Sequence, residues 1–340
     1  MPEDSIDHID FKDLDKRAIS PPLVKHMFTA DPSAHVFNGR IYIYASHDID
    51  AGIPFDDTGK HFAMEDYHVF SLDSPGSMVT DHGISLDIKN VAWAECQMWA
   101  PDAAYKKGKY YLYFPAKQSN GLFTIGVAIS EKPEGPFIPE SSPIQGSYSI
   151  DPAVFCDDDG RSYIYFGGIW GGQLQKYRNN AYHKKYEEPL PGEPALGPRV
   201  AQLTPDMTSL AEESREIIIQ DKYKAPLRAG DNLRRYFEGP WMHKHNDTYY
   251  FSYSTGDTHL ICYATGDNPY GPFTYQGIIL HPVVGWTTHH SICLFKEKWY
   301  LFYHDSSLSR GVTHLRSIKM TELHHNADGK IIEIFPYGKR

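Results

Sequence analysis

Cysteine is scarce in this chain, and long apolar runs are missing. Four of the 340 residues are Cys, and none of them forms a Cys-x-x-Cys pair. This pattern argues against a disulfide framework or a thiolate metal cluster, so we expect buried, reduced thiols. No segment approaches the roughly 20 consecutive apolar residues that a membrane-spanning helix needs. The first 20 residues are acidic and lack the apolar stretch of a secretory signal, from which we expect a cytoplasmic protein without a membrane partner.

An excess of positive charge is missing as well. The chain has 43 acidic residues against 33 Lys and Arg, a formal net charge of −10, and no basic run. This balance argues against nucleic acid as a partner, because a surface that binds nucleic acid has to offset the phosphate charge. The 3.6-residue apolar period of amphipathic helices is nearly absent, which argues against a mainly helical fold.

Aromatic residues in short alternating runs are abundant instead. They make up 14% of the chain, with 24 Tyr, and such alternation is typical of strands. A strand, a tight polar turn and an aromatic strand recur at Val36–Ser46, Ala104–Ala116, Val154–Gly168, Met242–Gly256 and Cys293–Asp305. A β-sandwich also has many short strands, but it would not repeat one hairpin in this way. Each repeat has room for about four strands. We therefore predict an all-β fold, a five-bladed β-propeller that forms a single domain over residues 21–340, after an N-terminal leader over residues 1–20.

Acidic residues stand at the heads of three of these repeats. Asp31 and Asp151 each precede a proline directly before a repeat hairpin, and Glu238 precedes another, with Phe237 before it and Trp241 shortly after. A single Asp-Pro pair is common in turns, where the carboxylate accepts backbone N–H groups. The innermost strands of propeller blades line one channel, however, so acids at matching positions would converge there. The apolar setting of Glu238 would also raise its pKa, as a general acid requires.

Four short motifs together resemble glycoside hydrolase family 43. They are ADPS at 30–33, WAPD at 99–102, SIDPAVF at 149–155 and FEGPW at 237–241. The resemblance runs from about Pro21 to the C-terminus. It is closest to the metal-dependent β-xylosidase and α-L-arabinofuranosidase branch, on the segments MFTADPSAHVFNGRIYIY, SHDIDAGIP and GGIWGGQLQ. It implies an inverting glycosidase, in which two carboxyl groups stand roughly 6.5–9.5 Å apart with a water between them.

The resemblance also implies a role for each acid. Asp31 matches the general base that activates water, and Glu238 matches the general acid that protonates the leaving oxygen. Asp151 matches the third acid, which orients Glu238 and raises its pKa, as a nearby like charge does. The segment TTHHSICLF places His289 at the family's channel histidine, with Thr288 where the family has Gly. In this branch that histidine is linked to a divalent ion, usually calcium within a shell of water. Calcium prefers oxygen ligands, which leaves a neutral, hydrogen-bonding His289 as the alternative.

Three more residues are expected to bind substrate. Trp99 resembles the family's pocket tryptophan, and Arg316 resembles the arginine that reaches the substrate from the last blade. Phe237, beside the general acid, is the third. Aromatic rings suit the C–H faces of a sugar, but Trp99 and Phe237 could instead belong to the core. The alternative for Arg316 is a surface ion pair.

The resulting hypothesis is an exo-acting β-xylosidase that releases xylose from the non-reducing end of xylo-oligosaccharides. It would also have α-L-arabinofuranosidase activity on arabinoxylo-oligosaccharides. One alternative is an enzyme that is primarily an α-L-arabinofuranosidase. Another is a propeller that binds sugar without turnover, against which the three acids argue. A retaining, fructosidase-like propeller, with carboxyl groups about 5–5.5 Å apart, is disfavoured by the ADPS context. The sequence leaves open whether the chain forms a homo-oligomer.

Overall fold

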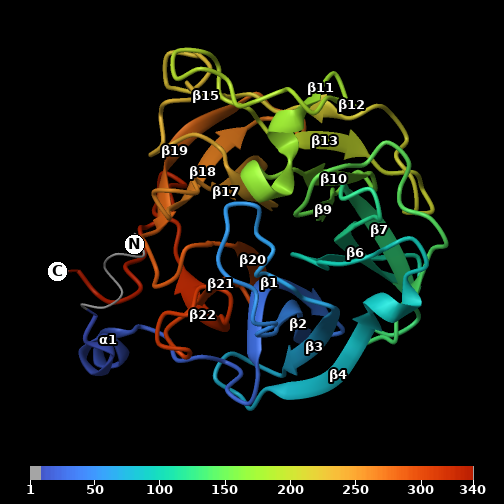
Figure 1. Ribbon diagram of the computed structural model, residues 1–340. Coiled ribbons are helices and arrows are strands. Elements are labelled where there is room, and N and C mark those ends of the chain that lie inside the picture. The colour runs from blue at the N-terminus through green and yellow to red at the C-terminus, as the bar shows by residue number, and fades with distance from the viewer. Residues whose placement is uncertain (1–8, 340) are drawn as a thin grey trace.

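Five small sheets surround one central axis in the computed structural model, which describes residues 9–339 (Figure 1). The predicted five-bladed β-propeller is thus confirmed. Each of the five repeated hairpins forms the first two strands of a blade, namely β1–β2, β5–β6, β9–β10, β16–β17 and β20–β21.

The blades follow one another along the chain. Blade 1 contains β1 (Phe28–Phe37), β2 (Arg40–Asp48), β3 (Asp66–Leu72) and β4 (Thr80–Asp87). Blade 2 contains β5 (Asp102–Lys106), β6 (Lys109–Lys117), β7 (Phe123–Ser130) and β8 (Ile138–Pro139). Blade 3 contains β9 (Ala153–Cys156), β10 (Ser162–Phe166), β13 (Arg199–Gln202) and β14 (Arg215–Glu216). Blade 4 contains β16 (Glu238–His245), β17 (Thr248–Ser254), β18 (Ile261–Gly266), β19 (Phe273–Leu280) and an edge strand, β15 (Ile219–Gln220). Blade 5 contains β20 (His290–Phe295), β21 (Lys298–Asp305) and β22 (Ser317–Leu323).

A long insertion separates β10 from β13 in blade 3. It contains two short 3₁₀ helices, Trp170–Gly172 and Leu174–Lys176, and a small hairpin of β11 (Tyr177–Arg178) and β12 (Ala181–Tyr182). A further 3₁₀ helix, Ile88–Asn90, follows β4. In Figure 1 the insertion lies at the inner end of blade 3, close to the loop that joins β2 to β3.

The aromatic alternation in the sequence reflects burial on both faces of a blade. In β2, Ile41 and Ile43 pack into the cluster shared with blade 5, whereas Tyr42 and Tyr44 pack into the cluster shared with blade 2. Successive side chains of a strand point to opposite faces. A strand covered on both sides therefore reads as a continuous apolar run. Each fully buried side chain of this size contributes about 1.5–3 kcal/mol to stability.

The innermost strands form a closed ring around the axis. β1 contacts β5 and β20, β9 contacts β5 and β16, and β16 also contacts β20. The segment from Leu23 to Thr29 joins the first and last blades, because the Leu23 N–H donates to the Ile318 carbonyl and the Thr29 N–H donates to the Arg316 carbonyl, both at 2.9 Å. This arrangement brings the heads of all five innermost strands to one end of the channel.

The N-terminal helix α1 (Phe11–Arg17) packs against the end of the chain. Asp10 caps it, and Leu14 lies in a small apolar cluster with Val284 and Tyr337. The division into a leader and a domain at residue 20 stays a prediction, and residues 1–8 of that leader lie outside the described residues. Within residues 9–339, no helix is long and apolar enough to cross a membrane.

The prediction of buried thiols is confirmed for two of the four cysteines. Cys262 and Cys293 are buried free thiols inside strands, whereas Cys96 and Cys156 are exposed. The exposed pair lies at the ends of regular structure, in the loop before β5 and at the last residue of β9. The sequence pattern did not distinguish strand interiors from strand ends.

Candidate active site

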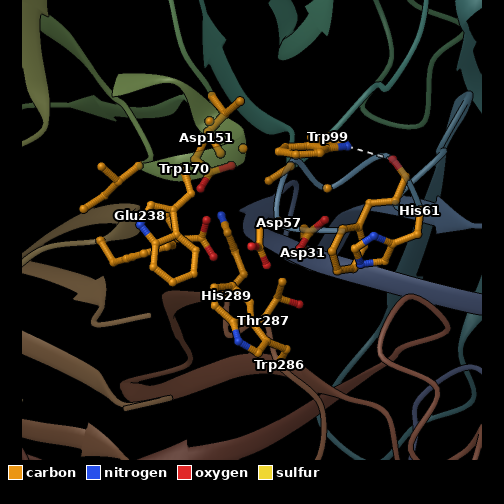
Figure 2. Close-up of a pocket in the computed structure, with 18 of the residues that line it drawn as sticks. Asp31, Asp57, His61, Trp99, Asp151, Trp170, Glu238, Trp286, Thr287 and His289 are labelled. Atoms are coloured by element: carbon orange, nitrogen blue, oxygen red, sulfur yellow. Dashed lines mark hydrogen bonds between the residues drawn. The ribbon is translucent and has the colours of Figure 1, made fainter. Parts of the chain in front are cut away.

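One pocket opens at the heads of the innermost strands. It encloses about 720 Å³, counting its solvent-filled mouth. The seven residues predicted from the sequence all line it, namely Asp31, Trp99, Asp151, Phe237, Glu238, His289 and Arg316. Each of the five blades contributes at least one of them. Figure 2 shows how the labelled acids of three blades surround the same space.

The three acids reach the pocket from an unusual backbone geometry. Asp31 lies at an irregularity of the β1–β2 pairing, between Ala30 and Ser33, and its φ is +52°. Asp151, two residues before β9, has a φ of +56°. A side-chain-bearing residue in this left-handed region costs energy, and outside tight turns it often marks a functional site. In blade 4 the left-handed residue is Gly239 (φ +63°), so Glu238 stands one position earlier than the two aspartates. The sequence-based expectation of fully matching positions is therefore off by one residue for Glu238.

Asp31 is fixed as a carboxylate by Arg316. The Arg316 guanidinium donates from Nη1 to Oδ1 at 3.0 Å and from Nη2 to Oδ2 at 3.4 Å, and the Ser46 hydroxyl donates to Oδ2 at 2.9 Å. Burial alone would raise the pKa of the Asp31 carboxyl, but the charge of Arg316, helped by the Ser46 hydrogen bond, brings that pKa below its usual range. Asp31 is thus ionised at neutral pH, as a general base must be.

Arg316 itself is held by a second buried acid, Asp48. The guanidinium donates from Nε to Asp48 Oδ2 at 2.9 Å and from Nη2 to Oδ1 at 2.8 Å, and the Arg316 backbone N–H donates to Oδ2 at 2.8 Å. All three side chains are almost fully buried. A fork of this kind fixes the guanidinium plane. Arg316 was expected to reach the substrate; it lines the pocket with its donors directed at Asp31, Asp48 and the Thr287 hydroxyl.

A neutral histidine supports Asp31 from behind. The Asp31 backbone N–H donates to His304 Nδ1 at 3.0 Å, so the ring proton is on Nε2, which lies 3.1 Å from the Thr287 carbonyl oxygen. Burial, together with the nearby Arg316 charge, lowers the pKa of His304 to about 3. His304 therefore contributes shape and hydrogen bonds to the site without adding a charge.

Burial raises the pKa of both Glu238 and Asp151. Burial raises the pKa of the Glu238 carboxyl well above its ordinary value, and the charges of Asp151 and Asp31 raise it further. Burial and Asp31 raise the pKa of Asp151 too, but Asp151 Oδ2 accepts the Gly239 N–H at 2.9 Å, which favours its charged form. The Glu238 carboxyl has no hydrogen-bond partner among residues 9–339 and keeps part of its surface open to the pocket. Burial and the neighbouring acids therefore favour a protonated Glu238.

Trp99 forms one wall of the pocket. Its ring packs against Phe123 with 4.7 Å between centroids and meets Phe62 edge-on, and its Nε1–H donates to the Phe62 carbonyl at 2.8 Å. Gly59 lies against the ring so closely that a Cβ there would be 2.7 Å from Cη2. Only 8% of Trp99 is exposed, so it serves both the core and the pocket wall.

The opposite wall is aromatic, and the sequence predicted Phe237 there but missed Trp170 and Trp286. Trp170 and Trp286 stack with 5.7 Å between their rings, and each meets Phe237 edge-on. The Trp170 Nε1–H donates to Glu188 at 2.5 Å. Phe237, only 1% exposed, lies behind these two rings. The two glycines after Trp170 could have indicated that this segment lies against the pocket. A Cβ at Gly171 would be 3.1 Å from the Trp99 ring, and one at Gly172 would be 2.7 Å from Ile150.

The loop between β2 and β3 supplies a second missed set. Its residues Phe55, Asp56, Asp57, His61 and Phe62 line the pocket. In Figure 1 this loop extends from blade 1 over the centre of the propeller. The stretch has no strand or helix period, so nothing in the sequence indicated where it would lie.

His289 occupies the bottom of the pocket, directly before β20. Burial lowers its pKa, so the ring is neutral, and neither ring nitrogen has a hydrogen-bond partner within the described residues. His290, the next residue, points into the blade, where its Nε2 lies 2.6 Å from Ser252 Oγ. An unpaired, buried imidazole between carboxylates fits an ion held by one nitrogen and several waters. The same ring could equally hydrogen-bond a channel water.

Comparisons with known proteins agree over nearly the whole chain. The sequence pattern of glycosyl hydrolases family 43 matches residues 21–331. The xylosidase/arabinosidase 43A of Humicola insolens is 60% identical over 320 residues, covering 92% of this chain and 98% of that protein. The xylosidase/arabinosidase of Bacteroides ovatus is 58% identical and covers 92% and 96%.

Solved structures give the same result. A GH43_1 enzyme from Xanthomonas citri, complexed with xylotriose, is 63% identical, with a TM-score of 0.93 and 97% of each chain covered. A GH43 beta-xylosidase/alpha-arabinofuranosidase from a compost microbial metagenome, in complex with xylotriose and in a calcium-free form, is 63% identical. Its TM-score is also 0.93, and 94% of this chain and 98% of that one are covered.

Proposed function

The chain belongs to glycosyl hydrolases family 43, and we propose that it is an inverting, exo-acting β-xylosidase with α-L-arabinofuranosidase activity. The observation that carries this proposal is the different ionisation of two carboxyl groups in one pocket. Arg316 keeps Asp31 charged, while burial and Asp151 keep Glu238 protonated. A base and an acid that hold these states at the same pH are what glycoside hydrolysis requires.

Each step of the reaction then has its residue. The Asp31 carboxylate accepts a proton from a water as that water attacks the anomeric carbon. Glu238 gives its proton to the glycosidic oxygen as the bond from that oxygen to the anomeric carbon breaks. Asp151 orients the chain of Glu238 through the Gly239 N–H and disfavours its charged form. Attack from the face opposite the leaving group inverts the anomeric configuration.

The substrate proposal rests on the pocket walls and on the relatives. Trp99 on one side and the stacked Trp170 and Trp286 on the other offer flat apolar faces to a pyranose ring. Relatives that match nearly the full chain are xylosidase/arabinosidases, and a similar structure holds xylotriose. We therefore propose xylo-oligosaccharides and arabinoxylo-oligosaccharides as substrates, bound with the terminal sugar in the pocket.

A calcium ion at His289 is part of the proposal. The unpaired, buried imidazole of His289 would hold the ion, with water as the remaining ligands. When bound, the ion would add positive charge near Asp31 and so favour the ionised form of the base. We expect removal of calcium with a chelator to lower kcat/KM and added calcium to restore it. Calcium binding, measured by calorimetry, should be lost in His289→Ala.

Two substitutions test the assignment of acid and base. Glu238→Gln should lower kcat/KM for xylobiose by about 10²–10⁴. It should lower kcat/KM less for 4-nitrophenyl β-D-xylopyranoside, because 4-nitrophenolate leaves without full protonation. Asp31→Asn should lower the rate equally for both substrates, because water activation is needed in each case. The matched control is Glu322→Gln, which changes an acid paired with Lys298 on blade 5 and should leave both rates unchanged.

The product tests the stereochemistry and the sugar preference. Proton NMR of the first xylose released from the β-xyloside should show the α-anomer; the β-anomer would contradict the inverting mechanism. The ratio of kcat/KM on 4-nitrophenyl β-D-xylopyranoside and 4-nitrophenyl α-L-arabinofuranoside decides which activity is the main one. Full activity in folded Glu238→Gln or Asp31→Asn would refute the proposed mechanism. Binding of xylotriose without any turnover would support the sugar-binding alternative.

A further inference from the structure

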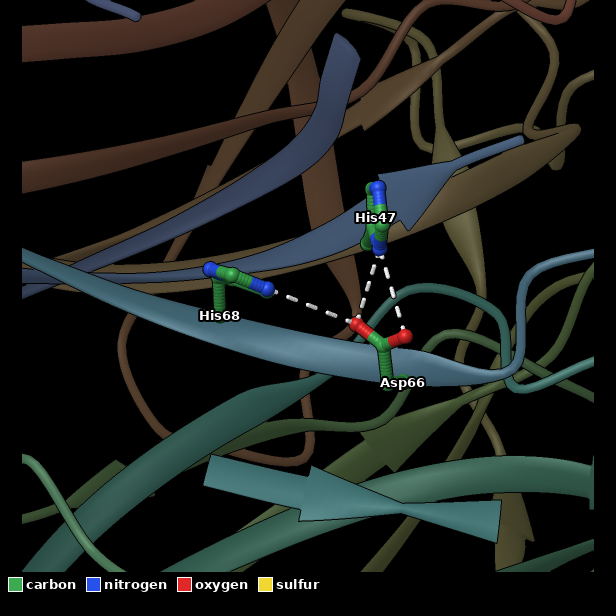
Figure 3. Close-up of side chains that lie close together, drawn as sticks. All are labelled: His47, Asp66 and His68. Atoms are coloured by element: carbon green, nitrogen blue, oxygen red, sulfur yellow. Dashed lines mark hydrogen bonds and ion pairs between the residues drawn. The ribbon is translucent and has the colours of Figure 1, made fainter. Parts of the chain in front are cut away.

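Two histidines and an aspartate converge outside the pocket, on blade 1. His47 Nδ1 lies 3.0 Å and 3.2 Å from the two oxygens of Asp66, and His68 Nε2 lies 3.8 Å from Asp66 Oδ1. Figure 3 shows both imidazole rings directed at the one carboxylate. One ligand atom from each residue lies within 4.8 Å of the others.

Strand register brings these residues together. His68 pairs with Ala45, and Tyr67 pairs with Ser46, in the antiparallel β2–β3 ladder. The next position along the ladder sets Asp66 opposite His47, and Asp66 and His68 are two residues apart, so all three side chains point to one face. None of the three lines the catalytic pocket. The group is therefore built on two paired strands, at the end where the β2–β3 loop leaves them.

The outer nitrogen of His68 is fixed by another acid. His68 Nδ1 lies 3.1 Å from Asp81 Oδ1, and Asp81 in turn accepts the Gly83 N–H at 2.8 Å and lies 2.8 Å from His26 Nε2. A carboxylate on the far nitrogen sets the tautomer of an imidazole, so Nε2 of His68 is left as an acceptor aimed at the cluster. Metal-ligating histidines commonly have this outer partner.

The spacing of the ligand atoms around Asp66 is compatible with a small ion. With bonds of about 2.0–2.1 Å, the ligand atoms of a tetrahedral zinc site lie about 3.3–3.4 Å apart. The two separations from Asp66 Oδ1, 3.0 Å to His47 and 3.8 Å to His68, bracket that value. The longer one exceeds a hydrogen bond, so His68 Nε2 has no hydrogen-bond partner among the described residues.

We propose that His47 Nδ1, the Asp66 carboxylate and His68 Nε2 bind a divalent transition-metal ion of the zinc type. Two imidazoles and one carboxylate are a donor set that suits zinc, whereas calcium prefers oxygen throughout. The side chains are 24%, 14% and 11% exposed, so water can reach the fourth position. The site is distinct from the ion proposed at His289, which lies in the channel.

The test measures zinc binding directly. The full chain is stripped with a chelator and then titrated with Zn²⁺ by calorimetry, with bound zinc counted by elemental analysis. All proteins carry Cys96→Ser and Cys156→Ser, because these exposed thiols could bind zinc themselves, and His289→Ala, which removes the channel imidazole. We expect one zinc per chain in this background.

Variants of the cluster decide the outcome. His68→Gln and the isosteric Asp66→Asn should each weaken zinc binding at least 10-fold, whereas His82→Gln should leave it unchanged. His82 is a suitable control because it also lies on blade 1, and the hydrogen-bond partner of its Nε2 is the Ser71 hydroxyl, at 2.8 Å, and not one of the three proposed ligands. Added zinc should raise the Tm of the background protein and not that of His68→Gln. Zinc affinity that is unchanged in both cluster variants would overturn the proposal, as would the absence of any bound zinc.

Discussion

Removal of the Arg316 charge should shift the acid limb of the pH–rate profile upward. Arg316→Met deletes the guanidinium that lies 3.0 Å from Asp31 Oδ1. Unit charges 4 Å apart interact by about 4 kcal/mol at an effective dielectric constant of 20. At 1.36 kcal/mol per pKa unit, that gives at most about 3 units, and neighbouring arginines shift aspartates by about 1–3 units.

The direction follows from the role of Asp31. Its pKa is depressed in the folded protein, and a base works only while ionised, so activity is lost as the pH falls through that pKa. With the arginine gone, burial and the charge of Asp48 both raise the pKa. The acid limb should therefore move up by about 1–3 pH units. Arg316→Lys, which keeps a charge but loses the fork, should shift it less.

Stability must be separated from catalysis in this experiment. Arg316→Met leaves Asp31 and Asp48 buried without their partner, which costs about 3–5 kcal/mol. In the wild type, the stabilisation from the ionised Asp31 is present above its unfolded pKa of about 3.9 and is lost as the pH falls through the lower folded value. Circular dichroism and Tm at each pH identify the range in which the variant is folded.

A buried arginine elsewhere supplies the control. Arg199→Met, in blade 3, removes a guanidinium whose donors serve the Tyr148 hydroxyl and the Gly197 carbonyl. It should lower Tm without moving the acid limb of kcat/KM on 4-nitrophenyl β-D-xylopyranoside. An acid limb that does not move in folded Arg316→Met would refute the view that Arg316 sets the ionisation of the base.

Three further substitutions probe the rest of the pocket. Asp151→Asn should shift the basic limb of kcat/KM down by about 1–2 pH units, because Glu238 works while protonated and Asp151 helps to keep it so; an unchanged basic limb would contradict this. Gly59→Ala places a Cβ 2.7 Å from Trp99 at a φ of +73°, so we expect a lower Tm and a higher KM, and a wild-type KM would show that Trp99 is only core. Trp170→Ala should raise KM about 10-fold with a smaller change in kcat, as a lost stacking surface of about 1–1.5 kcal/mol would do; steady-state kinetics on xylobiose measures both.

The repeated hairpins made much of the fold predictable from the sequence. A blade that is buried on both faces needs aromatic and aliphatic residues at successive positions. This pattern made the five hairpins recognisable in the sequence. Because the innermost strands share one channel, acids at repeat heads could be assigned to one pocket. Asp31, Asp151 and Glu238 followed from that reasoning, whereas His289 was assigned from the family resemblance.

The features that were not predicted lie outside the repeated hairpins or depend on contacts between distant residues. Trp170 and Trp286 lie in an insertion and in a loop, whose positions are set by tertiary contacts and not by a period. Asp48, at the end of β2, could not be predicted as the partner of Arg316. The two residues are 268 positions apart in the sequence, and a buried ion pair between such distant residues produces no local sequence pattern. The three-residue cluster on β2 and β3 was equally hidden, since only the register reveals that His47 faces Asp66.

The one-residue offset of Glu238 explains how similar repeats acquire different chemistry. At Asp31 and Asp151 the acid itself takes the left-handed conformation before proline, and its short side chain ends on fixed donors. In blade 4, Gly239 takes that conformation, and its N–H is the donor that Asp151 accepts. Glu238 is thereby moved one position back, on a longer side chain, with no donor from the described residues on its carboxyl group. Fixed donors favour the charged form of a carboxyl group, whereas burial without donors favours the protonated form. The same turn, shifted by one residue, thus places two acids on fixed donors and leaves the third, the proton donor, without one.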